Sequence, residues 1–302
     1  MRADLLVQVP SVVAECPLWD AARSGLWWVD VRQPSVSFWS DATGRVQTWP
    51  VQEPVGCIAL TDKDRVLLGL GGHLAEFDPF SGRVQPIVCI EPEVPAMRLN
   101  DGRVDPTGRL WIGSMSDLGD IPAGSLWTWE PGQAPVASIR EIFIPNALAF
   151  SSDGSQGTFA DTHTGDVISF ATADPFKSRV LLKSGAAAGR PDGAAMDQDG
   201  CVWNARFAGS CVVRITPEGK VDRTINLPAS NVTACAFGGS DLKTLYVTTA
   251  SKGLSAQERV RQPLAGSIFA IHLDQQGVAD GRISDAALCR SDRRTSHAHL
   301  TT

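Results

Sequence analysis

A short hydrophobic run recurs along the sequence at a nearly constant interval, and this repeat constrains the fold more than any other feature. Six copies occur, and the residues at their centres are Trp28, Leu68, Ile112, Phe159, Trp203 and Tyr246. The intervals between these centres are 40, 44, 47, 44 and 43 residues. An interval in the low forties is the length of a four-stranded β-propeller blade, so the repeat predicts a six-bladed β-propeller, with five or seven blades as the alternatives.

The residues around the repeats favour an all-β protein. Aromatic and β-branched residues dominate the runs, whereas Gly, Pro, Asn and Asp dominate the gaps, as in the turn Asp105-Pro106-Thr107-Gly108. We therefore expect one propeller domain over residues 1–289. The alternating segment 4–9 precedes the first repeat, where it can complete the last blade and close the ring. Residues 290–302 are polar and unpatterned, and we expect them to be disordered.

Composition limits the partners and the location. The net charge is −6 and the pI is near 5.4, and no basic run occurs before the last dozen residues, which argues against nucleic acid and anionic membranes. No segment has the length and apolar character of a signal peptide or a membrane span, so we expect a cytoplasmic protein. The 7 Cys form no CxxC pair, which is typical of reduced thiols. The sequence leaves open a monomer or a weak homo-oligomer.

Polar residues stand at the edges of several predicted strands, where a propeller would bring them together at its central channel. Glu15, Asn146 and Asp192 offer hard oxygen donors with two formal negative charges. Such a set suits Ca²⁺, Mg²⁺ or Mn²⁺ and tolerates Zn²⁺ or Fe²⁺, and three protein ligands leave positions for water and substrate. Each segment taken alone also fits an ordinary turn.

Five ordered blocks resemble the SMP-30/gluconolactonase/regucalcin family, and within it bacterial aldonolactonases. The blocks are Glu-Cys-Pro-Leu-Trp-Asp at residues 15–20, the segment 98–115 with its Asn-Asp-Gly and Asp-Pro-x-Gly-Arg turns, Pro-Asp-Gly at 191–193, the run 237–246 and the run 262–269. The resemblance extends from about residue 12 to about residue 280. It implies a six-bladed propeller with one divalent metal ion and a sugar lactone as its small-molecule substrate.

The resemblance also implies roles for individual residues. Glu15, Asn146 and Asp192 match the family's metal ligands, and Arg98 and Asn100 match residues that bind the substrate's oxygens. Asp192 matches the family's acid or base, although a metal-bound water is an equally reasonable nucleophile. The expected activity is metal-dependent opening of a gluconolactone, xylonolactone or arabinonolactone to the aldonic acid.

The sequence departs from the family pattern in two places. Ala147 stands where relatives usually have Gly, and its methyl group would matter if that position needs a glycine-like backbone. Some members carry an acidic residue shortly after the segment that matches residues 113–115, and here Asp117 or Asp120 are the candidates to replace it. Substrate preference is the property most exposed to this second change.

Other polar residues are weaker candidates. His163 follows the fourth repeat strand, His297 and His299 form a pair in the tail, and Cys16 adjoins Glu15 but has no evident base, which favours a packing thiol. The competing functions are a non-catalytic calcium- or ligand-binding propeller and a protein-interaction scaffold of the WD type. The WD type is disfavoured because its Trp-Asp and Gly-His signals are absent from the repeat ends.

Overall fold

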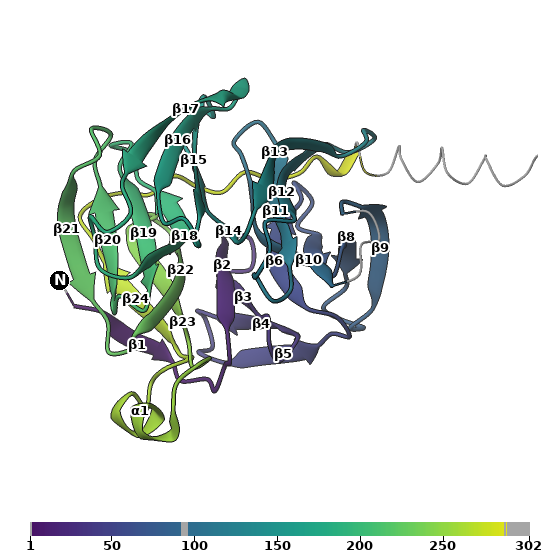
Figure 1. The fold of residues 1–302 in the computed structure, drawn as a ribbon. Coiled ribbons are helices and arrows are strands. Elements are labelled where there is room, and N and C mark those ends of the chain that lie inside the picture. Colours follow the sequence, from purple (N-terminus) through teal and green to yellow (C-terminus); the bar gives the residue numbers. More distant parts are fainter. Residues whose placement is uncertain (1, 92–95, 287, 289–302) are drawn as a thin grey trace, which may run out of the picture.

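Six antiparallel sheets of four strands each form a ring, so the chain is a six-bladed β-propeller (Figure 1). The structure is a computed structural model that describes residues 2–91, 96–286 and 288. All six repeat centres lie in the second strand of a blade, which confirms the blade count predicted from the spacing. The predicted disordered tail, with His297 and His299, lies outside the described residues.

The first strand of each blade packs against the first strands of its neighbours around the central channel. These inner strands are β2 (Ala14–Asp20), β6 (Val55–Leu60), β10 (Met97–Val104), β14 (Pro145–Phe150), β18 (Arg190–Met196) and β22 (Asn231–Gly238). The second strands are β3 (Gly25–Asp30), β7 (Val66–Leu70), β11 (Leu110–Ser116), β15 (Gln156–Asp161), β19 (Val202–Phe207) and β23 (Thr244–Ala250). The third strands are β4 (Ser35–Ser40), β8 (His73–Phe77), β12 (Gly124–Trp129), β16 (Val167–Ala171), β20 (Cys211–Ile215) and β24 (Ile268–His272). The outer strands are β5 (Val46–Pro50), β9 (Val84–Cys89), β13 (Val136–Ile142), β17 (Asp174–Leu182), β21 (Val221–Asn226) and β1 (Asp4–Val7).

The sixth blade joins the two ends of the propeller. Its outer strand β1 comes from the N-terminus and pairs antiparallel with β24, with Asp4 opposite Ala270 and Leu5 opposite Phe269. This pairing confirms that the segment before the first repeat completes the last blade. It also covers an edge of β24 that would otherwise expose unpaired backbone groups.

The Asp-rich turns between inner and second strands are tied to buried tryptophans. In three blades an aspartate at the turn accepts a hydrogen bond from a tryptophan indole N–H on the second strand, at 2.8 to 3.1 Å; the pairs are Asp20–Trp27, Asp105–Trp111 and Asp197–Trp203. The same carboxylates also accept backbone N–H groups of their own turns. A buried indole N–H needs such a partner, which accounts for the recurrence of Asp before the apolar runs.

Each inner strand carries a β-bulge, and the bulges position the site. The pairing register shifts between Glu15 and Leu18 in β2, and equivalent shifts fall at Val55/Cys57, Leu99/Gly102, Asn146/Ala149, Pro191/Ala194 and Val232/Ala234. A bulge leaves residues out of the ladder and redirects their side chains. The candidate site residues lie at or beside these bulges, so an inner strand can turn one polar side chain toward the channel while the rest of it stays in the sheet.

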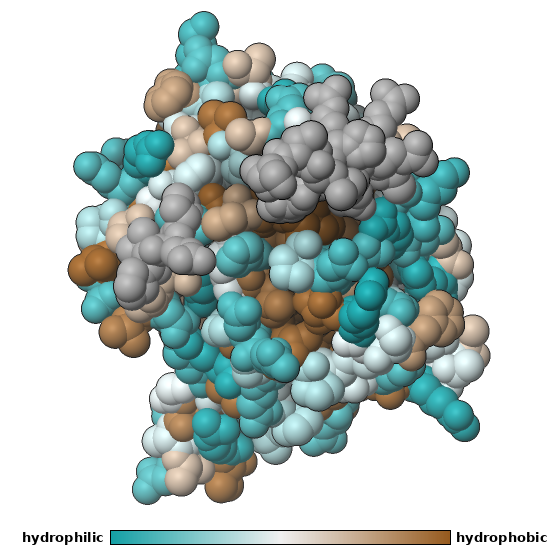
Figure 2. All heavy atoms as spheres, turned by 90° about the vertical axis from the view of Figure 1, so that its right-hand side faces the viewer, coloured by the Kyte–Doolittle hydropathy of each residue, from teal (hydrophilic) through white to brown (hydrophobic). Residues whose placement is uncertain are grey.

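A C-terminal segment after β24 crosses from blade to blade, as the yellow ribbon in Figure 1 shows. Its backbone donates hydrogen bonds from Val278 to Met196, from Gly281 to Val104 and from Ile283 to Leu60, which belong to inner strands of three blades. On the face drawn in Figure 2, hydrophilic residues surround a recessed group of hydrophobic ones. The short helix α1 (Ala256–Arg261) is exposed, and no helix of the described chain is long and apolar enough to cross a membrane.

Candidate active site

The five residues singled out from the sequence come together in one pocket of about 180 Å³. Glu15 reaches it from β2, Arg98 and Asn100 from β10, Asn146 from β14 and Asp192 from β18. The volume is small beside the ~300–1,000 Å³ of sites that bind drug-sized ligands, and it suits a small substrate. The structure therefore places the predicted residues side by side, whereas their roles as metal ligands and substrate contacts remain predictions.

Two of the predicted ligands are followed by residues in a left-handed backbone conformation. Ala147, after Asn146, has a φ of 62°, and Cys16, after Glu15, has a φ of 47°. The family resemblance raised the question of whether position 147 needs a glycine-like backbone, and it does. A residue with a Cβ atom pays roughly 1–2 kcal/mol in this region, yet the Asn146 side chain still lines the pocket.

The orientation of the Asn146 amide is fixed by its neighbours. Its Nδ2 donates to Thr162 Oγ1 at 2.8 Å, and that hydroxyl in turn donates to the carbonyl of Pro191 at 2.7 Å. Asn100 Nδ2 donates to Asn146 Oδ1 at 3.3 Å and to the carbonyl of Pro145 at 2.9 Å. Because Nδ2 is occupied by Thr162, the oxygen of the Asn146 amide is the atom presented to the pocket.

Asp192 lies in a bulge that a second buried network holds from behind. Asn204 Nδ2 donates to the backbone carbonyl of Asp192 at 2.8 Å, and Arg206 Nη1 donates to Asn204 Oδ1 at 2.9 Å. Gly193 permits close contact with the next blade, since a Cβ there would lie 2.5 Å from Ala234 Cβ. These contacts leave the Asp192 carboxylate with the backbone N–H of Gly193 as its hydrogen-bond donor among the described residues.

Glu15 and Asp192 are carboxylates whose pKa values stay raised although Arg98 and Arg206 act to lower them. Neither forms an ion pair with any residue of the described chain. Burial, and then the negative charge of Asp101, raise the pKa of Glu15 to about 8. Burial, and then the charge of Glu15, hold the pKa of Asp192 well above its ordinary value. Two such acids stay protonated unless positive charge is brought to them.

The donor set therefore fits a divalent cation. Two carboxylates and the oriented oxygen of the Asn146 amide are the hard ligands that Ca²⁺, Mg²⁺ and Mn²⁺ prefer. Within residues 2–91, 96–286 and 288, no cluster of three or more His, Cys, Asp or Glu side chains is arranged to hold a metal ion. The candidate metal site in this pocket therefore consists of two carboxylates and one amide, the side chain of Asn146.

Arg98 and Asn100 form the other wall of the pocket. Arg98 is buried and donates from Nη1 to Asn100 Oδ1 at 2.7 Å and from Nε to Asp117 Oδ1 at 2.7 Å. Asp117 also accepts from Arg32 Nη1 at 2.8 Å. Of the two acidic candidates after residue 115, Asp117 lines the pocket, whereas Asp120 accepts a hydrogen bond from Ser116 Oγ instead.

The weaker candidates lie elsewhere or have other tasks. His163 is exposed and stacks on Phe143, with ring centroids 4.1 Å apart. Burial raises the pKa of Cys16 to about 12, so its thiol stays protonated and it serves as a packing residue. The sequence interpretation gave no role to Thr162 or Asn204. The sequence shows that Thr162 follows a repeat strand and that Asn204 lies within one. It does not show the hydrogen bonds that these residues make to Asn146, Pro191 and Asp192.

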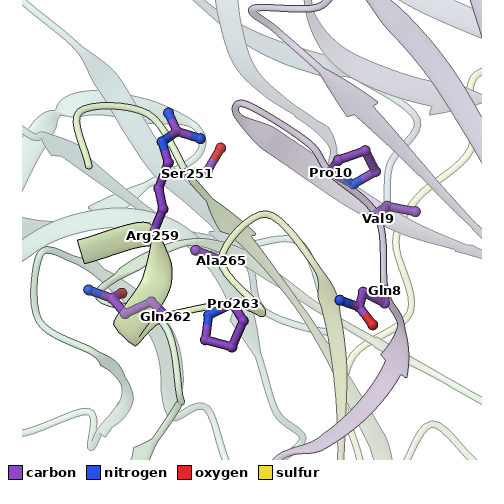
Figure 3. A pocket seen from close by; sticks show the side chains of 8 residues that line it. All are labelled: Gln8, Val9, Pro10, Ser251, Arg259, Gln262, Pro263 and Ala265. Carbon is purple, nitrogen blue, oxygen red and sulfur yellow. The ribbon is translucent and has the colours of Figure 1, made fainter. Parts of the chain in front are cut away.

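A larger cavity of about 330 Å³ lies between α1 and the N-terminal segment (Figure 3). Arg259 and Gln262 line it from α1 and the residue after it, and Gln8 and Pro10 line it from the opposite side. None of the residues that line it carries a carboxylate. It therefore offers no donor set for a divalent cation and is separate from the channel pocket.

Comparisons with known proteins agree with the fold and identify the family. Residues 13–251 match the family model described as SMP-30/Gluconolactonase/LRE-like region. The chain is 32% identical to 6-deoxy-6-sulfogluconolactonase of Pseudomonas putida, over 91% of this chain and 96% of that protein. It is 33% identical to L-arabinolactonase of Azospirillum brasilense, over 94% and 96% of the two chains.

Animal and solved relatives extend the comparison. Regucalcin of Danio rerio is 31% identical over 90% of this chain and 94% of its own length. The crystal structure of a calcium-binding protein, regucalcin, from Agrobacterium tumefaciens superposes with a TM-score of 0.87 at 27% identity, covering 93% of this chain and 96% of that one. The relatives named as sugar lactonases support a lactonase function. The chain belongs to the SMP-30/gluconolactonase/LRE-like family.

Proposed function

We propose that this protein is a lactonase that uses a bound divalent metal ion to open a sugar-acid lactone to the aldonic acid. The observation that carries the proposal is that two carboxylates with raised pKa values and no ion pair in the described chain, Glu15 and Asp192, meet the oriented amide of Asn146 in one small pocket. A polar wall of Arg98 and Asn100 faces them. The names of the lactonase relatives support the reaction class.

The residues divide into those that hold charge and those that hold the substrate. A metal ion held by Glu15, Asn146 and Asp192 would supply Lewis acidity toward the lactone carbonyl. Arg98 would orient the oxygens of the substrate, with Asn100 holding its guanidinium in place. Asp192 would take one proton from the attacking water and return it to the ring oxygen as the acyl C–O bond breaks, so that water is consumed and a carboxylic acid and a hydroxyl are formed. The acid then ionises to the carboxylate and releases the second proton to solvent.

A second candidate is a propeller that binds calcium or another ligand without catalysis, because the similar regucalcin from Agrobacterium tumefaciens is described as a calcium-binding protein. The donor set suits Ca²⁺ equally well for binding alone. Arg98 favours the enzyme, because a buried guanidinium near Glu15 opposes the binding of a cation, whereas it can bind the oxygens of a substrate.

The test is a proton-release assay over a panel of aldonolactones with EDTA-treated protein and with the same protein after Ca²⁺, Mn²⁺, Mg²⁺ or Zn²⁺ is restored. We expect at least one lactone to open faster only when metal is present. If calorimetry detects metal binding but no lactone is accelerated with any metal, the non-catalytic candidate is correct.

Asp192→Asn tests the assignment of the acid. It keeps the shape of the side chain but removes its charge, and we expect turnover to fall by at least about 100-fold because proton transfer and metal charge compensation are both lost. Asp274→Asn is the matched control, since Asp274 is exposed and lies outside the pocket. Substantial activity in Asp192→Asn would show that this residue has been assigned wrongly.

A further inference from the structure

Outside the candidate metal ligands, the basic side chains that line the pocket outnumber the acidic ones. Arg32, Arg98 and Lys252 all line the pocket, together with a single acid outside the candidate metal-binding set, Asp117. Glu15 and Asp192 are not counted, because they are candidate ligands of the divalent cation. These three basic residues and Asp117, called the cationic rim below, bear a formal charge of +2.

Asp117 cannot neutralise the rim because two guanidinium groups share it. Its Oδ1 accepts from Arg98 at 2.7 Å and its Oδ2 from Arg32 at 2.8 Å, while its backbone carbonyl accepts from Arg32 Nη2 at 2.7 Å. Both arginines are thereby held rigidly beside the pocket. Rigid guanidinium groups are well suited to binding an anion, because little side-chain entropy is lost when they bind.

Lys252 is the third cation, and it forms no ion pair with any residue that the structure describes. Its backbone is anchored, since its N–H donates to the carbonyl of Val12 at 3.0 Å and its carbonyl accepts from Asn231 Nδ2 at 2.9 Å. Burial, and then the charges of Arg32 and Arg98, lower the pKa of Lys252. Asp117 and Asp192 act in the opposite direction on this pKa, and Lys252 lines the same pocket as the two arginines.

A neutral aldonolactone offers these cations hydrogen-bond acceptors but no negative charge. Under the proposed function the lactone carbonyl lies near Glu15, Asn146 and Asp192, and the rim residues line the same pocket of about 180 Å³. The rim contains three cations and one shared carboxylate, so its net charge favours the binding of an anion beside it. We propose that the cationic rim recognises an anionic substituent, a carboxylate, phosphate or sulfonate, on the exocyclic carbon of the lactone; this inference rests on the proposed lactonase function.

The test compares two lactones that differ only at C6, the terminal exocyclic carbon. D-glucono-1,4-lactone carries a neutral CH₂OH group there, and D-glucaro-1,4-lactone carries a carboxylate. We expect the metal-loaded protein to have a kcat/KM at least tenfold higher for the glucarolactone at low ionic strength, and we expect this preference to shrink as salt is added. A gluconolactone with a 6-phosphate forms a third arm, and its rate relative to the glucarolactone identifies which anion fits the rim.

Lys252→Met removes the unpaired charge and keeps the length of the side chain. We expect Lys252→Met to lower kcat/KM about tenfold for the glucarolactone and less than twofold for the neutral lactone. Lys252→Glu should lower kcat/KM for the glucarolactone further. Lys243→Met is the matched control, because Lys243 precedes β23 whereas Lys252 follows it, at the opposite end of the same strand. Equal losses on both lactones would mean that Lys252 acts on the reaction in general and would overturn the proposal, as would wild-type rates that do not favour the anionic lactone.

Failure of the proposed function is distinguishable from failure of the rim. Calorimetric titration with glucarate and with gluconate measures recognition of the second carboxylate without any turnover. Tighter binding of glucarate that is lost in Lys252→Met supports the rim even if no lactone is opened. Equal binding of the two acids by the wild type contradicts it even if lactones are hydrolysed.

Discussion

Thr162 is expected to set the metal affinity of the pocket through Asn146, and Thr162→Val tests this. The valine keeps the branched shape but cannot accept from Asn146 Nδ2 or donate to the Pro191 carbonyl, the two bonds of 2.8 and 2.7 Å that the hydroxyl makes. Each buried group left unpaired costs roughly 1–3 kcal/mol, and the added buried methyl returns about 0.8 kcal/mol. We expect the free energy of unfolding of the metal-free protein to fall by about 2–4 kcal/mol.

The effect on metal binding should exceed what a general loss of stability can produce. Without Thr162, the Asn146 amide can rotate and present its NH₂ group to the pocket in place of its oxygen. Groups that orient a ligand in this way typically contribute 10- to 100-fold to metal affinity. Calorimetric titration with Ca²⁺ and Mn²⁺ below the unfolding transition measures the affinity, and urea titration measures the stability.

Thr249→Val is a matched control for this substitution. Thr249 is also buried, and its hydroxyl also makes two bonds, accepting from the Gly266 N–H at 3.0 Å and donating to the Ser267 carbonyl at 2.7 Å. It lies in the sixth blade and does not line the pocket. We expect a similar loss of stability with unchanged metal affinity. The reasoning is refuted if Thr162→Val binds both ions as tightly as the wild type, or if the two variants lose affinity equally.

Two further predictions concern the charge and the backbone of the site. Glu15 has an ordinary pKa of 4.5 and a folded pKa of about 8, so the folded metal-free protein binds more protons than the unfolded chain between these values. Its stability should therefore fall as pH rises, by up to about 1.4 kcal/mol per pH unit. Thermal unfolding at pH 5 and pH 7 should show this loss of stability in the metal-free protein and a smaller loss with saturating Ca²⁺. If the loss is the same with and without Ca²⁺, the assignment of Glu15 as a ligand is wrong. Ala147→Gly relieves roughly 1–2 kcal/mol of left-handed strain but removes a buried methyl worth about 0.8 kcal/mol and adds unfolded-state entropy. Its unfolding free energy should stay within about 1 kcal/mol of the wild type in urea titration, and a loss above 2 kcal/mol would mean that the methyl packs more tightly than this balance allows.

The propeller could be predicted from the sequence because its strands have a regular composition and spacing. The second strand of every blade is buried on both faces, and this produces the short apolar runs around residues such as Trp28 and Trp203. The closing strand was also predictable, since residues 4–9 alternate before the first repeat and need a partner. These features depend on local patterns, which one sequence displays directly.

The polar contacts that orient the site could not be predicted in the same way. Thr162 and Asn204 follow or lie within ordinary strand sequences, and nothing near them in the chain indicates that Thr162 joins Asn146 to Pro191. The cationic rim could not be predicted either. Arg32 and Lys252 are separated from Asp117 by long stretches of sequence and meet it only when the ring closes. Contacts between blades depend on the register of each bulge, and a single sequence does not display that register.

The bulges explain why this site has no compact signature. An inner strand must keep its hydrophobic residues facing the neighbouring blades, so a regular strand would also aim its polar residues along fixed directions. A bulge frees a residue such as Asn146 from the ladder, but it demands an unusual backbone nearby, which Ala147 adopts at a φ of 62°. The same arrangement recurs at Glu15 and Cys16. A left-handed residue that is not glycine is unfavourable on its own, and one follows each of two candidate ligands in separate blades. Asn146 and Glu15 are thus directed by bulges that no short sequence motif specifies.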